Sequence, residues 1–388
     1  MEKLRSFLLY TLLLAFISSF FSITLFELFL VLAIPIGVFS VLKEKTYNGI
    51  FSIPLLGHLS VITLSSILFL KVKQQWIRLL EQDFFSLSYF SAFGLDKKRA
   101  KKLVEYILTL SPLLGLLVSV KVLYTYFSTG DFKAFWGGDF VIGNILALPF
   151  FSSLYLFFFK KDWNFRYIFL LLGILFLFVA FLPIKRSVIL GFILGILIFL
   201  IGIYKLFGFS RKVLIVLGLA ILGFTISIYN SPKVKIWIEH LSREDINSFS
   251  SNRILIAKGA FELIRKAWEE GDYAKLLIGW GYGPQKQYKN LPPNLQFINE
   301  YESFLPLTAF INGGILNLIF VVWFYFAAVY LTYRGLKNSC SQFLGMKLVL
   351  ISSVWVNLVY HLFTLFWVPI NAIFYIILAL IEKMEKLK

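Results

Sequence analysis

The sequence predicts an all-α polytopic membrane protein, and three observations carry that prediction. Of the 388 residues, 59% are hydrophobic and 19% aromatic, while only 15% are charged, which is far from the composition of soluble domains. The apolar residues form long runs, and a transmembrane helix needs about 20 of them. The formal charge of +17 comes from basic residues clustered between the apolar runs. Such clusters orient membrane helices, so we expect a bilayer partner and no nucleic acid.

The apolar runs give twelve expected spans joined mostly by short turns. The first run resembles a signal peptide but lacks a small-residue cleavage site and leads into a second run, so we interpret it as a retained span. Residues 71–82 fit either an amphipathic interfacial helix or a solvated connector. The shortest span follows them. The expected spans are residues 6–22, 25–42, 50–70, 84–95, 103–127, 140–159, 167–183, 187–204, 213–229, 304–331, 343–363 and 365–381.

The basic clusters also predict which ends of the spans share a side. The run of Lys and Arg at residues 97–102 is the strongest cytoplasmic marker. It places both termini in the cytoplasm and residues 128–139 and 184–186 on the opposite side. The ninth span then delivers the chain to the outside, where the segment 230–303 lies.

That segment is the only long polar insertion, and it divides a single membrane domain into spans one to nine at residues 1–229 and spans ten to twelve at residues 304–388. Cys340 is the only cysteine, so no intrachain disulfide holds the insertion together. Because the rest of the chain consists of hydrophobic segments joined by short turns, we expect the insertion to carry the reaction site of a membrane enzyme.

Two basic residues, Lys185 and Arg186, stand between two spans on the outer side, where Asn or Gly would serve a tight turn equally well. A charge at membrane depth costs about 2.5–3.5 kcal/mol, so such residues tend to be paired or functional. Lys185 also fits a snorkelling anchor at the interface. The Arg186 guanidinium offers two donors to a phosphate group.

Arg253 is expected in the first turn of a helix whose N-cap is Ser251 or Asn252. A helix N-terminus favours an anion through its free N–H groups and its dipole. The alternative is a surface amphipathic helix whose arginine is solvated. The apolar residues that repeat at helical spacing are Ile256, Ala260, Phe261, Ile264, Ala267 and Trp268.

A glycine-rich turn follows, Gly279-Trp280-Gly281-Tyr282-Gly283. Its backbone could approach a ligand or form an anion nest, or it could pack against a neighbouring helix. Trp280 and Tyr282 also fit anchors at headgroup level. No Gly-Lys-Ser/Thr follows the turn, so it is not a nucleotide loop.

Glu300 and Glu302 stand at the boundary of span ten, where partial desolvation makes a carboxylate a stronger base. They equally fit ordinary loop carboxylates. His361 falls near the outer end of span eleven and could reach the same cavity. The three histidines have no metal-ligand spacing and no Asp-x-Asp pair occurs, so we expect neither a metal nor another cofactor.

Together these motifs resemble the O-antigen ligase and O-antigen polymerase superfamily of membrane glycosyltransferases. The Leu-Pro-Ile-Lys-Arg-Ser turn ending at Ser187, the Asn252-Arg253 helix followed by the glycine turn, and Glu302-Ser303-Phe304-Leu305 with Gly313 occur in the family's order. The number of spans and the place of the long loop agree as well.

The resemblance implies a GT-C-like fold and transfer of a glycan from an undecaprenyl-diphosphate carrier, without metal or nucleotide and with inversion at the anomeric carbon. Arg186 and Arg253 would bind the donor diphosphate, with Lys185, Asn252, Gly281, Tyr282, Gly283, Glu300 and His361 as further substrate-binding residues. Ligases place a histidine where Glu302 stands, so a polymerase, with a second lipid-linked glycan as acceptor, is favoured over a ligase that joins glycan to lipid A-core.

The resemblance also implies a cell inner membrane with the long loop in the periplasm. A lipid or polysaccharide transporter and a non-catalytic assembly protein are the competing interpretations. Transporters tend to show paired halves with interrupted helices, whereas the polar elaboration here is one loop on one side.

Overall fold

The computed structural model describes residues 1–46, 48–69, 83–183 without 161–164, 185–208, 253–282, 304–337, 341–363 and 368–385, with short pieces between 76 and 80 and between 214 and 239. These residues form helices and turns, without a strand among them. The helices are α1 (Glu2–Ser18), α2 (Ile23–Lys43), α3 (Ser52–Phe69), η1 (Phe84–Leu87), α5 (Ser88–Phe93), α6 (Lys97–Thr129), α7 (Ile142–Phe159), α8 (Arg166–Phe181), α9 (Arg186–Phe207), α13 (Arg253–Glu269), α14 (Tyr273–Ile278), α15 (Leu305–Lys337), α16 (Ser341–His361) and α17 (Val368–Glu385).

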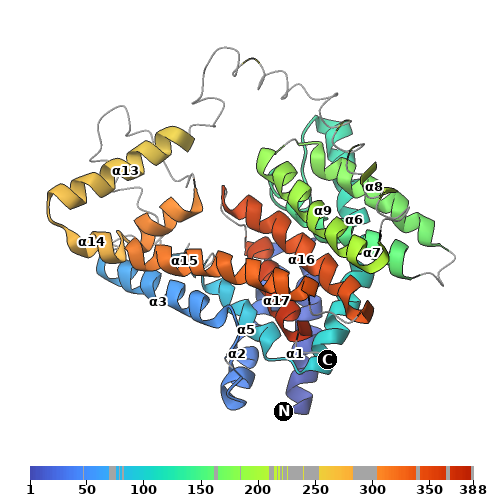
Figure 1. Cartoon of the computed structure of the whole chain (residues 1–388), viewed down its shortest axis with the longest axis horizontal. Helices are drawn as coiled ribbons and strands as arrows, with labels where there is room; N and C mark the ends of the chain where they lie inside the picture. Colours follow the sequence, from blue (N-terminus) through green and yellow to red (C-terminus); the bar gives the residue numbers. More distant parts are fainter. Residues whose placement is uncertain are drawn as a thin grey trace.

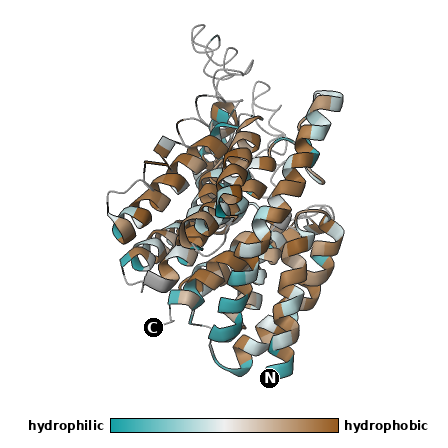
Figure 2. Ribbon diagram, turned by 90° about the vertical axis from the view of Figure 1, so that its right-hand side faces the viewer, coloured by the Kyte–Doolittle hydropathy of each residue, from teal (hydrophilic) through white to brown (hydrophobic). Residues whose placement is uncertain are grey.

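Seven helices of the described chain are long and apolar enough to cross a membrane, namely α2, α3, α6, α7, α9, α15 and α16. The helices are hydrophobic along most of their length (Figure 2). Many large apolar side chains, such as Val31, Ile67 and Phe326, are exposed on their outer faces. An exposed apolar surface on this scale is typical of an α-helical membrane protein. Most of the expected ninth span lies outside the described residues.

One continuous core joins the bundle, and small residues let its helices approach closely. Along α9, a Cβ at Gly191 would lie 2.7 Å from the backbone oxygen of Val356, and one at Gly195 would lie 2.8 Å from that of Ser352. The backbones of α9 and α16 are therefore in direct contact, as is common between membrane helices. Figure 1 shows α6 to α9 grouped on one side of α16 and α17, with α3 and α13 to α15 on the other.

Side-chain contacts sort the turns of the chain into two ends. At the end that holds both termini (Figures 1 and 2), Arg99 at the start of α6 donates to Ser6 Oγ at 3.0 Å. At the opposite end, Trp136 donates to Ser19 O at 2.7 Å. There too, Lys185 lies 3.0 Å from Asp139. This is the same grouping of turns that the basic clusters predict.

The expected fourth span is not one continuous helix. Only η1 and the six-residue α5 are helical within it, and six residues of helix span about 9 Å. The chain nevertheless runs along α3 between the two ends: Leu79 packs with Ile62 and Tyr282, Asp83 contacts His58, and Tyr89 reaches Glu382 near the termini. The described residues among 76–80 are helical, with Leu79 buried and Ile77 and Leu80 exposed, which does not fit a simple solvated connector.

Buried charges hold the terminal end together. Glu382 accepts from Tyr89 OH at 2.6 Å and from the Ile50 N–H at 3.0 Å. Glu385 lies 3.1 Å from the Lys347 ammonium, and both side chains are buried. Glu382 and Glu385, which follow the expected last span at residues 365–381, thus belong to α17 and pack inside the bundle.

Replacing Lys347 with methionine is expected to lower the stability of the protein by about 2–3 kcal/mol, because the buried Glu385 carboxylate loses its nearest cation and keeps only the partly exposed Arg334 at 3.7 Å. Thermal unfolding in detergent measures the change. The double variant K347M/E385L removes both charges and should recover most of the loss. Lys101→Met is the matched control, since the Lys101–Glu105 pair is largely exposed and contributes about 1 kcal/mol or less. Equal losses in K347M and K101M would contradict the assignment.

Candidate functional site

Two arginines far apart in the sequence meet on one cleft at the end of the bundle opposite the termini. Arg186 comes from the start of α9, and Arg253 comes from α13. The cleft has a volume of about 460 Å³ and is open to its surroundings. We call it the arginine cleft, and its lining is Arg186, Ser187, Leu190, Arg253, Ile254, Ala257, Phe304 and Phe363.

Local sequence explains why both arginines stand where they do. Arg186 is the first residue of α9, directly after the turn that contains Pro183. Arg253 lies in α13, which the structure describes from this residue onward, so the expectation that it belongs to a helix is confirmed, whereas Ser251 and Asn252, the expected N-caps, lie outside the described residues. Arg186 stands at a helix N-terminus, whose free N–H groups and positive dipole end also favour an anion.

The packed face of α13 fixes the direction in which Arg253 points. Ala260, Leu263 and Ala267 pack with Trp280 and Ile311, beside the partly buried Ile256 and Ile264. The expectation that Phe261 and Trp268 belong to this face is wrong, because these side chains are 62% and 67% exposed. Gly259 and Leu263 are buried on this face of α13 together with Ala260 and Ala267, so the packed face differs from the apolar stripe that the sequence predicts.

The electrostatics of the arginine cleft favour an anion. Arg253 is half-buried, and its guanidinium lies 5.8 Å from the centre of the Phe363 ring. Burial lowers the pKa of Arg253 from its ordinary value, although a guanidinium stays protonated in proteins. The charge of Arg253 also acts on Arg186. An anion between them would relieve this repulsion and replace part of the lost hydration.

The remaining walls of the arginine cleft are mainly apolar. Leu190, Ile254 and Ala257 face it from α9 and α13, and Phe304 and Phe363 close it, with their ring centres 6.2 Å apart. The Phe304–Phe363 pair is held in place because Leu305 N donates to Leu362 O at 2.9 Å. The arrangement can therefore take an anionic group that is attached to an apolar chain.

The glycine turn lies at a different place and packs against a kink in α15. The kink is at Gly313 and Gly314. A Cβ at Gly279 would lie 2.4 Å from Gly313 N, and Trp280 N donates to Ile311 O at 2.8 Å. Trp280 is buried, so it is not a headgroup anchor. Of the interpretations of this turn, helix packing is the one that these contacts support.

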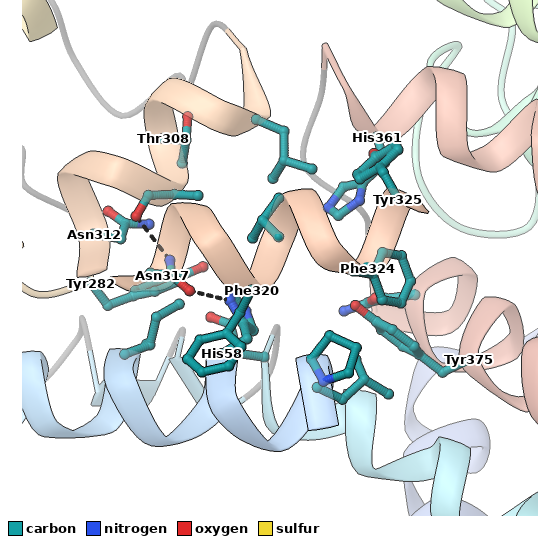
Figure 3. Close-up of a pocket in the computed structure, with 18 residues that line it drawn as sticks. His58, Tyr282, Thr308, Asn312, Asn317, Phe320, Phe324, Tyr325, His361 and Tyr375 are labelled. Carbon is teal, nitrogen blue, oxygen red and sulfur yellow. Dashed lines mark hydrogen bonds and ion pairs between the residues drawn. The ribbon is translucent and has the colours of Figure 1, made fainter. Parts of the chain in front are cut away.

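A second, smaller cavity is lined by Leu305 and His361, which stand close in the sequence to Phe304 and Phe363 of the arginine cleft (Figure 3). We call it the inner chamber. Its volume is about 70 Å³, and its polar lining comes from α3, from the residue before η1, from the turn after α14, from α15, from the end of α16 and from α17. The ionisable residues and amides that line it are His58, Asp83, Tyr282, Asn312, Asn317, Tyr325, His361, Asn371 and Tyr375.

The remaining predicted site residues separate into three groups. Lys185 pairs with Asp139 beside the cleft, which agrees with a structural role. His361 and Tyr282 line the inner chamber, and Gly281 lies in the packed turn with a φ of 87°. Asn252, Gly283, Glu300 and Glu302 lie outside the described residues. No group of three metal-ligating side chains occurs in the part of the chain that is described.

Sequence reasoning missed the cluster of His58, Asp83 and Asn317. His58 Nδ1 lies 2.6 Å from Asn317 Oδ1 and its Nε2 lies 3.1 Å from Asp83 Oδ1 (Figure 3). The available signal was a histidine inside an apolar span, since intramembrane ionisable residues are rare and are usually paired or functional. Its two partners stand far away in the sequence, and no motif connects them.

No family model matches the chain. Over 161 residues it is 30% identical to an uncharacterized protein of Aquifex aeolicus (strain VF5), and this match covers 42% of the present chain and 39% of that protein. The matched region therefore spans less than half of either chain.

Proposed function

We propose that the protein is a metal-independent, inverting membrane glycosyltransferase that takes its glycan from a polyprenyl diphosphate. The observation that carries the proposal is the meeting of Arg186 and Arg253 on one cleft with apolar walls. A diphosphate has two anionic groups for two guanidiniums, and its polyprenyl chain suits the apolar surface. The resemblance of the motifs to O-antigen ligases and polymerases points to undecaprenyl diphosphate as the carrier.

In the proposed reaction, an acceptor hydroxyl oxygen attacks the anomeric carbon of the donor sugar. The bond from that carbon to the diphosphate oxygen breaks, and the diphosphate leaves with the bonding electrons. The hydroxyl proton passes to a base, and Glu302 is the residue that the family resemblance favours. Arg186 and Arg253 stabilise the charge that develops on the leaving diphosphate. Fixed cations in a partly dry site are among the strongest contributions to catalysis.

The proposed location is the cell inner membrane, with the arginine cleft at the periplasmic surface and both termini in the cytoplasm. Arg99 and its neighbouring basic residues stand at the end that holds the termini. This agrees with the rule that cytoplasmic loops are rich in Lys and Arg. Labelling single cysteines placed at residues 97 and 261 with a membrane-impermeant reagent tests the orientation: we expect only the second to react in intact spheroplasts.

We favour a polymerase over a ligase because Glu302 stands where ligases have a histidine. Glycan analysis of a strain that lacks the protein separates the two functions. Loss of a polymerase should leave single repeat units on lipid A-core, whereas loss of a ligase should leave full-length polymer on the carrier lipid. Unchanged lipopolysaccharide and unchanged carrier-linked glycan would contradict both.

Reconstitution separates the enzyme from a transporter. Purified protein in detergent is supplied with an undecaprenyl-diphosphate glycan labelled in its sugar. A polymerase joins two labelled units and releases undecaprenyl diphosphate, with no metal required. Movement of the labelled lipid across proteoliposomes without any new linkage would instead identify a transporter.

A further inference from the structure

In the inner chamber the two ring nitrogens of His58 face two oxygen atoms, one of Asn317 and one of Asp83. A neutral imidazole has one N–H and can donate to only one of them. Asn317 Nδ2 donates to Ala309 O at 2.8 Å, and a carbonyl only accepts. The other amide atom, Oδ1, is therefore the one that faces His58 Nδ1 at 2.6 Å. It follows that Nδ1 carries a hydrogen.

The same ring meets a second acceptor. His58 Nε2 lies 3.1 Å from Asp83 Oδ1, and a neutral imidazole has only one N–H. With its hydrogen on Nδ1, a neutral ring would direct the Nε2 lone pair at a carboxylate. One additional proton must lie between the two groups. Imidazole is ordinarily the stronger base of the two, so the proton belongs to His58 and the pair is an imidazolium with a carboxylate.

The cluster also connects to the elements that carry the arginine cleft. Ala309 stands in the last turn of α15 before the kink at Gly313 and Gly314. Asn317 binds the Ala309 carbonyl from beyond the kink and so bridges the two halves of the helix. On the same turn, Ile311 O accepts from Trp280 N. Trp280 packs against α13, the helix that carries Arg253.

We propose that His58 is a resident proton-binding site, and that its imidazolium, acting through Asn317, clamps the kink of α15 to which α13 and α14 are attached. The inner chamber has room for water beside His58. Asn312 is buried, and its Oδ1 has no hydrogen-bond partner among the described residues, nor has Asp83 Oδ2. These oxygens and a volume of about 70 Å³ suit a few water molecules, at roughly 15 Å³ each.

Loss of the His58 proton should weaken the clamp. A neutral ring cannot donate to Asn317 and to Asp83 at once, so one of the two contacts breaks in that state. The other ionisable side chains that line the inner chamber are Tyr282, Tyr325, His361 and Tyr375. A second positive charge on His361 would repel that on His58, so we assign the single proton to His58. This inference does not depend on what the arginine cleft binds.

Nitrogen-15 NMR of the full chain, labelled in its histidines and held in nanodiscs, tests the proton directly. The chain has three histidines, His58, His240 and His361, and the variant His58→Gln assigns the signal. At neutral pH we expect both nitrogens of His58 to be protonated. In Asp83→Asn the carboxylate that accepts from Nε2 is gone, so we expect one of the two nitrogens to be bare. One bare nitrogen in the wild type at neutral pH would overturn the proposal.

Spin labels test the clamp independently of the proton. Cysteines at the exposed positions Phe261 on α13 and Leu64 on α3 carry the labels, with Cys340 replaced. We expect a narrow distance distribution in the wild type and a broad one in Asn317→Leu, which loses the contacts to His58 and to Ala309 O. Size-exclusion chromatography confirms that this variant is folded. A distribution that stays narrow in Asn317→Leu would remove the clamp from the proposal.

Discussion

Replacing Arg186 or Arg253 with alanine is expected to lower the rate of glycan transfer by about a hundredfold to a thousandfold, as removal of one donor to a developing oxyanion does in other enzymes. The physical reason is that each variant leaves a diphosphate charge without its cation in a partly dry cleft. The measurement is the turnover of undecaprenyl-diphosphate glycan by purified protein. The lysine variants should retain more activity, because an ammonium keeps the charge but loses the paired donors.

Arg265→Ala is the matched control for these variants. Arg265 lies on the same helix as Arg253, but its side chain is 62% exposed and pairs with Glu262 and Glu269. Its loss should leave turnover within about twofold of the wild type. Equal amounts of folded protein in all variants exclude a stability effect. Full activity in the double variant R186A/R253A would end the assignment of the cleft.

Replacing Gly314 with alanine is expected to destabilise the protein by more than about 4 kcal/mol, a loss that only strain or a severe clash produces. Gly314 has a φ of 65° and a ψ of −164°, which is a region open essentially to glycine alone. Its Cβ would also lie 2.3 Å from the backbone carbon and oxygen of Leu277. The attachment of α14 to α15 should therefore break. Thermal unfolding in detergent measures the effect.

Gly271→Ala separates the clash from the backbone strain. Gly271 also has a positive φ, 71°, but the nearest atom to an added Cβ is a side-chain carbon of Tyr273 at 3.9 Å. Its substitution should cost about 1–2 kcal/mol, the left-handed strain alone. If Gly314→Ala and Gly271→Ala were equally stable, the close packing of α14 on the kink would be wrong.

Hydrophobic runs and charge clusters predicted most of the described membrane helices and the end of the bundle at which their turns lie. Apolar segments of about 20 residues became helices, and the turn that holds Lys185 lies at the same end as Trp136, as the charges predicted. The helix described from Arg253 onward was predicted from its periodicity. These features depend on residues close together in the chain, where pattern and structure are directly linked.

The features that escaped prediction depend on contacts between distant segments. The segment from Leu79 to Phe93 crosses the bundle in short pieces because it packs along α3, and no local pattern shows that neighbour. The exposure of Phe261 and Trp268 depends on which helices cover α13. The inner chamber needs His58 and Asn317 to meet across a kink, so it appears only once the fold is known.

Binding of undecaprenyl diphosphate to the purified protein, compared with undecaprenyl monophosphate, tests the central claim most directly. If Arg186 and Arg253 hold one diphosphate, the wild type should prefer the diphosphate, and each single alanine variant should lose most of that preference. The two losses should then be non-additive in the double variant, because both residues act on one ligand. Equal binding of the two lipids by the wild type, or additive losses, would contradict the account.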